Sequence, residues 1–294
     1  MRRKPAGRTG PFAVLPAAAA ALLALAGCAH AATPAPGTAS TATAADTLPG
    51  SHVHGIAVSG ETSQVLLATH EGLFDATTSP ATKIGGTNDL MGFAPGPADG
   101  VFYASGHPGP GSDLPNPLGL LRSSDGGKTW EQLSRQGESD FHALTATQAG
   151  IVAFDGVLRT SPDGKAWSTV AADFAPAALA GHPDSTTVLA TTQDGIQRST
   201  DAGSTWKPLD NGPLIQFAAF AHPAEAVGVE PDGTVHYSAD AGETWTEKGR
   251  INADVMAIAA IKGDDGRPWI WAATPDGVIV STDGGVTFRP ADAE

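Results

Sequence analysis

The side chains best suited to chemistry in this chain are histidines, and they gather in its first half. Five of the nine histidines lie between residues 52 and 142: His52, His54, His70, His107 and His142. Neutral imidazole is a common metal ligand. Combined with the thioether of Met91 it favours copper, and combined with carboxylates it favours zinc. His54, His142 and Met91 are therefore a candidate metal set, with copper or zinc as the ion.

Carboxylates in the same stretch allow a second kind of chemistry. Glu138, Asp140, Asp89 and Asp113 do not precede a glycine, whereas Asp155 and Asp194 belong to Asp-Gly hairpin turns. A pair of carboxylates on either side of a sugar bond is the machinery of most glycoside hydrolases. Asp113, Glu138 and Asp140 are the candidate catalytic residues of such an enzyme, although their spacing specifies no reaction.

An internal repeat indicates which elements must position these residues. Five segments share a serine, an aspartate, a glycine and an aromatic residue in register, and they recur about every 40 residues. They begin at Ser123, Ser161, Ser199, Ser238 and Ser281, and the second is one residue short. Their pattern, Ser-x-Asp-x-Gly-x-Thr-Trp, resembles the Asp-box (BNR) repeat.

The chemistry of this repeated segment is structural. Its carboxylate can accept backbone N–H groups of its own turn, and its glycine supplies the positive φ that the turn needs. The aromatic ring covers the hairpin and buries apolar surface. We therefore predict that five aspartates form turns and neither catalyse nor bind calcium: Asp125, Asp163, Asp201, Asp240 and Asp283.

Each repeat predicts one four-stranded blade. A small apolar run, a turn, a second strand, a tight turn and a third strand precede each segment, and a fourth strand follows it. A degenerate sixth copy starts at residue 52. The sequence thus predicts an all-β, six-bladed β-propeller over residues 51–291, with blades starting near 52, 89, 140, 175, 215 and 253. No strand is left to complete a split blade, so we expect side-chain packing to close the ring.

Strand order assigns every loop of such a blade to one of two faces. The top face carries the loops that join strand two to strand three and strand four to the next blade. The bottom face carries the repeat turns. His182 and His222 map to the bottom, whereas the five histidines between residues 52 and 142 map to the top of blades 1 to 3. One position of the first strands aligns, blade by blade, as His54, Met91, His142, Ala177, Phe217 and Met256.

Blade 2 also carries an unusually long top loop, residues 106–119, rich in proline and glycine. Long loops beside a pocket often carry function. The loop and the aligned position together define the candidate ligand-binding residues: His52, His54, His70, Met91, His107, Asn116 and His142.

Several longer stretches resemble bacterial secreted proteins known as sialidase-like glycosyl hydrolases: residues 52–56, 69–74, 91–93, 104–108, 116–120 and 139–142. The resemblance implies a carbohydrate-active propeller. Sialidases, however, grip their substrate with three arginines, and here only Arg135 and Arg250 map to top loops, while Arg159 maps beside a repeat turn. The Arg-Ile-Pro motif of sialidases is absent from the sequence. Because a fold does not carry function, we do not expect sialidase activity.

The first 50 residues predict export and a lipid anchor. Arg2, Arg3, Lys4 and Arg8 precede an apolar run that is short for a membrane span, which is typical of a signal peptide (residues 1–27). The following Leu-Ala-Gly-Cys resembles the bacterial lipobox, in which the cysteine, here Cys28, carries lipid. Cys28 is the single cysteine, so an intrachain disulfide and a cysteine-based zinc site are excluded. Residues 28–50 have the composition of a flexible, lipid-anchored linker.

The chain has a net charge of −14, which opposes binding to nucleic acid. We expect a monomeric, extracytoplasmic lipoprotein, anchored to the cell membrane by its lipid. Its propeller would be a non-catalytic binding or scaffold module for a protein or glycan ligand. Two alternatives stay open: a sialidase-like glycoside hydrolase that uses a carboxylate pair, and an envelope protein that binds metal through histidine and methionine.

Overall fold

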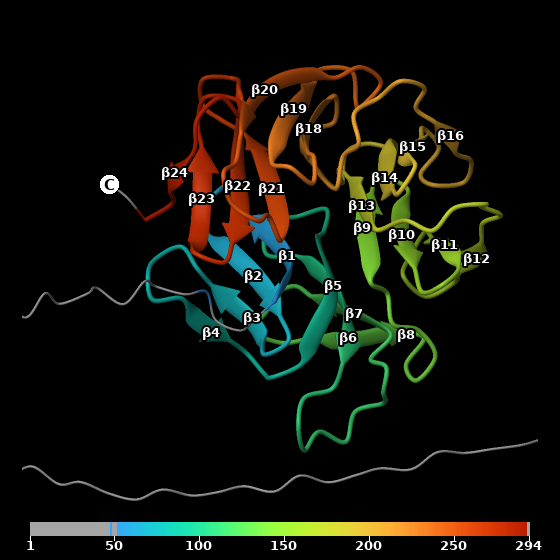
Figure 1. Ribbon diagram of the computed structural model, residues 1–294. Coiled ribbons are helices and arrows are strands. Elements are labelled where there is room, and N and C mark those ends of the chain that lie inside the picture. The colour runs from blue at the N-terminus through green and yellow to red at the C-terminus, as the bar shows by residue number, and fades with distance from the viewer. Residues whose placement is uncertain (1–47, 49–51, 293–294) are drawn as a thin grey trace, which may run out of the picture. The chain divides into compact units, whose positions relative to one another are not determined.

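The computed structural model describes residue 48 and residues 52–292, which form six four-stranded antiparallel sheets. The four strands of every sheet are consecutive in sequence and follow one another in order across the sheet. The sheets stand as blades around a common centre (Figure 1), which confirms the predicted all-β, six-bladed propeller. The predicted signal peptide, Cys28 and, apart from Leu48, the linker lie outside the described residues.

Turn residues interrupt the apolar runs at short intervals, so the strands are short. Blade 1 contains β1 (Val53–Val58), β2 (Val65–Thr69), β3 (Gly72–Asp75) and β4 (Thr82–Ile84). Blade 2 contains β5 (Asp89–Pro95), β6 (Phe102–His107), β7 (Leu120–Ser123) and β8 (Glu131–Ser134). Blade 3 contains β9 (Ala143–Thr147), β10 (Gly150–Phe154), β11 (Leu158–Ser161) and β12 (Ser168–Thr169).

The second half repeats this plan. Blade 4 contains β13 (Ala178–Gly181), β14 (Val188–Thr192), β15 (Gly195–Ser199) and β16 (Lys207–Pro208). Blade 5 contains β17 (Phe217–His222), β18 (Glu225–Val229), β19 (Thr234–Ser238) and β20 (Thr246–Arg250). Blade 6 contains β21 (Ala257–Lys262), β22 (Pro268–Thr274), β23 (Gly277–Ser281) and β24 (Arg289–Pro290). The first strands of blades 3 to 6 begin a few residues later than the sequence predicts.

The first strands form the inner ring, and β21 of blade 6 contacts β1 of blade 1. The core lies between neighbouring blades, where small and branched side chains interdigitate. At the closing interface Val53 and Leu67 of blade 1 pack with Ala257 and Trp271 of blade 6. Because each sheet uses only its own four consecutive strands, side-chain packing closes the ring across the described residues.

Four of the five repeat turns share one hydrogen-bond pattern, and the shorter turn of blade 3 has no threonine. In blade 5, the Ser238 hydroxyl donates to Asp240 and accepts the backbone N–H of Gly242. The Asp240 carboxylate also accepts the backbone N–H of Thr244 at 2.8 Å and the Thr244 hydroxyl at 2.6 Å. Desolvation would raise the pKa of Asp240, but these bonds outweigh it and lower that pKa to about 2. The carboxylate thus ties the turn together.

All of the described secondary structure is strand, turn or bend, and no helix long and apolar enough to cross a membrane occurs among these residues.

Candidate functional site

Two β-bulges change the direction of side chains at the top of blades 1 and 2. The pairing of β1 with β2 shifts register between Val53 and Gly55, and that of β5 with β6 shifts between Leu90 and Gly92. The extra residue is His54 in the first case and Met91 in the second. Bulges bend a strand and change the direction in which a side chain points. His54 and Met91 therefore leave the regular alternation at equivalent places, as their alignment in the sequence predicts.

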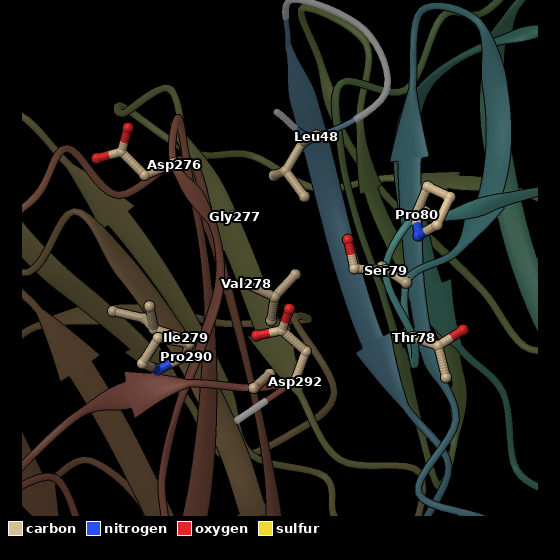
Figure 2. A pocket seen from close by; sticks show the side chains of 13 residues that line it. Leu48, Thr78, Ser79, Pro80, Asp276, Gly277, Val278, Ile279, Pro290 and Asp292 are labelled. Atoms are coloured by element: carbon tan, nitrogen blue, oxygen red, sulfur yellow. The ribbon is translucent and has the colours of Figure 1, made fainter. Parts of the chain in front are cut away.

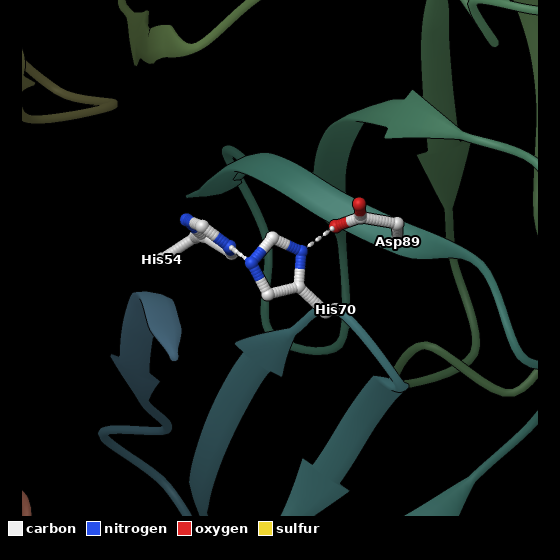
Figure 3. Close-up of side chains that lie close together, drawn as sticks. All are labelled: His54, His70 and Asp89. Atoms are coloured by element: carbon white, nitrogen blue, oxygen red, sulfur yellow. Dashed lines mark hydrogen bonds and ion pairs between the residues drawn. The ribbon is translucent and has the colours of Figure 1, made fainter. Parts of the chain in front are cut away.

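The first cluster joins His54, His70 and Asp89 (Figure 3). His70 directly follows β2, in the turn that leads to β3, and Asp89 is the first residue of β5 in the neighbouring blade. The Nε2 atoms of His54 and His70 lie 3.1 Å apart, and Nδ1 of His70 lies 2.9 Å from Oδ1 of Asp89. One possible ligand atom from each of the three residues lies within 4.8 Å of the other two.

His52 completes a group of three imidazoles at this place. Its ring stacks with that of His54 at a centroid distance of 6.0 Å, and it meets the His70 ring edge-on at 5.9 Å. His52 lies directly before β1, two residues from His54 in sequence. His52 and His70 are exposed, and His54 is half-buried.

The second cluster is centred on Asp140 of blade 3. Its Oδ2 atom lies 2.6 Å from Nε2 of His142 and 3.1 Å from Nε2 of His107. His107 comes from the start of the long loop of blade 2, and its Nδ1 lies 2.7 Å from Oδ1 of Asn116 in the same loop. Both ring nitrogens of His107 thus face acceptors. An imidazole in that position is stabilised as the doubly protonated cation.

The two clusters influence each other electrostatically. Burial lowers the pKa of His54, and the nearby imidazoles of His70, His52 and His142 lower it further, against the opposite effect of Asp89. In contrast, the hydrogen bond to Asn116 raises the pKa of His107, and the negative charges of Asp140 and Asp89 add to this rise. The site therefore holds a histidine that favours its neutral form beside one that favours its cationic form.

Of the three candidate catalytic carboxylates, only Asp140 belongs to these clusters. The Glu138 side chain is 65% exposed and pairs with Arg135 at 3.4 Å. Asp113 is exposed in the long loop. The Oδ1 atom of Asp140 is buried and accepts no hydrogen bond from any described residue. Because buried polar atoms are almost always hydrogen-bonded, this oxygen is an exception among the described residues.

The arginine pattern differs from the prediction in one place. Arg159 belongs to the top of blade 3 rather than to the repeat turn, because its Nε donates to the carboxylate of Asp155 in the β10–β11 hairpin. Arg135 also reaches Asp155, at 3.8 Å. Both Arg159 and Arg135 therefore pair with the carboxylate of Asp155.

The aligned position needs one correction, in blade 5. Backbone N–H groups of Ala177, Gln216 and Met256 donate to equivalent carbonyls of their second strands. The residue equivalent to His54 is therefore Gln216, and Phe217 is one position further along. The sequence missed this because a run of apolar residues follows Gln216 without a marker of strand register. Met91 is half-buried and Met256 packs against the closing core.

The sequence places Asp89 among the carboxylates near the histidines but not among the candidate ligand-binding residues. Only the structure shows that the start of β5 lies against the β2–β3 hairpin of blade 1, where Asp89 contacts His70. His236, which the sequence placed in no group, lies in blade 5 with its Nε2 2.6 Å from Oε1 of Glu230. This pair is separate from the two clusters.

A hollow of about 190 Å³ lies elsewhere, between the outer strands of blades 1 and 6 (Figure 2). Leu48, Pro80, Val278 and Ile279 give it a mainly apolar lining, with Asp276 at its edge. None of the residues of the two clusters lines it. The hollow is lined by no histidine, whereas five histidines lie at the top of blades 1 to 3.

No family model and no curated protein matches the chain. Among solved structures, it is similar to the GH74 xyloglucanase from Xanthomonas campestris, with a TM-score of 0.55 and 17% identity over 83% of this chain and 46% of that one. It is similar to U3-55K, with a TM-score of 0.52 and 11% identity over 83% and 82% of the two chains. It also matches YCF48 bound to D1 peptide, with a TM-score of 0.45 and 18% identity over 68% and 67%.

The chain thus spans less than half of the xyloglucanase. Identities this low show the fold alone, and a fold does not carry function. The resemblance to Asp-box proteins stays a prediction, whereas the repeat itself and the propeller that it builds are established.

Proposed function

We propose that this chain is a non-catalytic binding module whose ligand site is the top of blades 1 to 3. The observation that carries the proposal is the convergence of five histidines and two aspartates from three blades onto one surface. These imidazoles are mainly exposed: the side chains of His70, His107 and His142 are 42%, 41% and 59% exposed. Exposed ion pairs add little stability, so packing does not account for the clusters.

The donors and acceptors of the surface indicate the class of ligand. Asp140 offers a buried oxygen that lacks a donor, and Asp89 offers a second carboxylate. The chain as a whole is acidic. Such a surface favours a ligand that brings hydrogen-bond donors or positive charge, such as the hydroxyls of a glycan, an amine or a metal cation, and it repels anions.

A glycan and peptide binding screen on the purified protein tests the proposal. We expect Asp140→Asn to lose binding of the ligand that is found. Asp194→Asn is the matched control, because Asp194 occupies a top hairpin of blade 4, outside the clusters, and should bind as the wild type does. A ligand that Asp140→Asn retains would contradict the site. Turnover of a bound glycan would instead identify a glycoside hydrolase.

We also propose that the protein is held outside the cytoplasm by lipid on Cys28. The support is the order of cationic segment, apolar run and Leu-Ala-Gly-Cys in the sequence. Cys28→Ala should move the protein from the membrane fraction to the soluble fraction. A wild-type protein that mass spectrometry finds without lipid would contradict the anchor.

A further inference from the structure

We propose that His54 and His70 bind a transition-metal ion through their Nε2 atoms, with His52 as a third imidazole ligand and Asp89 as the carboxylate that orients His70. The ion is zinc(II) or copper(II). The inference rests on the proposed top-face site and names the class of ligand that the first cluster takes.

The distance between the two Nε2 atoms carries the argument. Metal–nitrogen bonds of about 2.0–2.1 Å place two neighbouring ligand nitrogens of one ion about 3 Å apart. The Nε2 atoms of His54, on β1, and of His70, in the β2–β3 turn of the same blade, lie 3.1 Å apart. The separation of these two nitrogens thus suits two ligands of one ion, which the rings reach by small reorientations from their edge-on contact.

Asp89 decides which nitrogen of His70 is available. A carboxylate only accepts hydrogen bonds, so Nδ1 of His70 donates its proton to Oδ1 of Asp89 at 2.9 Å. In neutral His70 the Nε2 atom then carries the lone pair, and it faces His54. Metal-binding histidines are commonly oriented by a carboxylate on their second nitrogen in this way.

His52 supplies the third ligand. Its ring lies about as far from the His54 ring as from the His70 ring, at 6.0 and 5.9 Å. Its side chain is exposed and can rotate toward the ion. Three imidazoles and an open fourth position suit zinc or copper, whereas calcium and magnesium prefer sets of oxygen ligands.

The neighbouring cluster shows the opposite arrangement. His107 has an acceptor at each ring nitrogen, Asn116 at one and Asp140 at the other. Both ring nitrogens of His107 are thus engaged by acceptors of the protein, and among the described residues the only group of side chains spaced to hold a metal is that of His54, His70 and Asp89. The ion is thus assigned to the first cluster, and not to the set of His54, His142 and Met91 that the sequence favours.

Titration calorimetry of the full chain with zinc(II) and copper(II) tests the inference. The protein is purified with a chelator and without a histidine tag, and cobalt(II) absorption then reports the ligand geometry. We expect one ion per chain. His54→Ala and His70→Ala should each weaken binding at least 100-fold, and Asp89→Asn should weaken it 10- to 100-fold with unchanged stoichiometry.

His222→Ala is the matched control, because His222 lies near His182 at the bottom with a ring separation of 6.5 Å. It should leave metal affinity unchanged. The inference is overturned if the wild type binds none of the three ions, or if His54→Ala binds as well as the wild type. Asp140→Asn should keep the metal affinity within about threefold, so loss of glycan or peptide binding in that variant is judged separately from the metal site.

Discussion

Blades 1 to 3 and blades 4 to 6 share one frame but differ at their top ends. The hairpin that carries His70 is fixed by the hydroxyl of Thr69, which donates to the carbonyl of Gly72, and Thr192 and Thr274 make the same bond in blades 4 and 6. In those blades Gln193 and Pro275 stand where blade 1 has His70. The position of His54 is likewise taken by Ala177 in blade 4 and by Gln216 in blade 5.

This difference separates the residues that build the propeller from those that form the two clusters on its top surface. The repeat turns, the hairpin threonines and the interblade cores recur in both halves, because every blade must solve the same packing problem. The imidazoles, the long loop and the carboxylates of the two clusters occur in one half only. Departures from the repeat therefore locate the candidate site.

The largest expected effect tests the shared frame. Trp167 of blade 3 and Trp206 of blade 4 both donate from Nε1, to Ser134 and Gly203, and both are half-buried. Replacement of either by alanine should lower the free energy of unfolding by about 3 kcal/mol, the low end for buried aromatic residues. Unfolding in guanidinium chloride measures it. A cost below about 1 kcal/mol in one blade only would show that the two halves are not built alike.

A smaller effect is expected at a repeat turn. Asp240→Asn should cost about 1 kcal/mol at neutral pH, since it weakens the bonds to Thr244. The pKa of Asp240 is lowered in the folded state from its ordinary value of 3.8 to about 2. The contribution of Asp240 is therefore complete above pH 3.8 and is lost as pH falls through 2.

Unfolding of the wild type and Asp240→Asn at several pH values checks this. The stability difference should be equal at pH 7 and pH 5, and it should shrink between pH 4 and pH 2. A difference that grows in acid would mean that the carboxylate is not tied to its turn.

The third prediction sharpens the contrast between frame and site. The double variant His54→Ala with His70→Ala removes from blade 1 two imidazoles that blade 4 lacks at the equivalent positions. It should change the free energy of unfolding of the metal-free protein by about 1 kcal/mol or less, because His70 is exposed and His54 is only half-buried. Thermal unfolding in chelator measures the change. A loss of several kcal/mol would make these histidines part of the frame.

The smallest effect concerns the long loop of blade 2. The pKa of His107 is raised in the folded state, first by its bond to Asn116, so its cation stabilises the fold. This contribution is complete below the unfolded value of 6.5 and is lost as pH rises through the folded pKa. The melting temperature of the wild type should therefore exceed that of His107→Gln more at pH 5.5 than at pH 8.5. An equal difference at both pH values would contradict the cationic form.

Much of this molecule follows from sequence alone, because a repeat constrains six copies at once. The spacing of Ser123, Ser161, Ser199 and Ser238 determines the number of blades, and strand alternation then assigns each loop to a face. In this way His52, His54, His70, His107 and His142 are placed on one face without coordinates. Strand register is predicted less well where an unbroken apolar run fills the first strand. In blade 5 the sequence therefore aligned Phe217 where the structure has Gln216.

Only the tertiary structure decides which of these side chains meet. Contacts between blades join residues whose separation in sequence carries no signal: Asp89 starts β5 but contacts His70 of the previous blade, and Asp140 joins His142 to His107 across a blade boundary. The sequence favours His142 and Met91 as partners of His54, whereas the fold provides His70. The reason is that the repeat determines the position of each backbone segment, while bulges, hairpin geometry and the neighbouring blade determine where each side chain points.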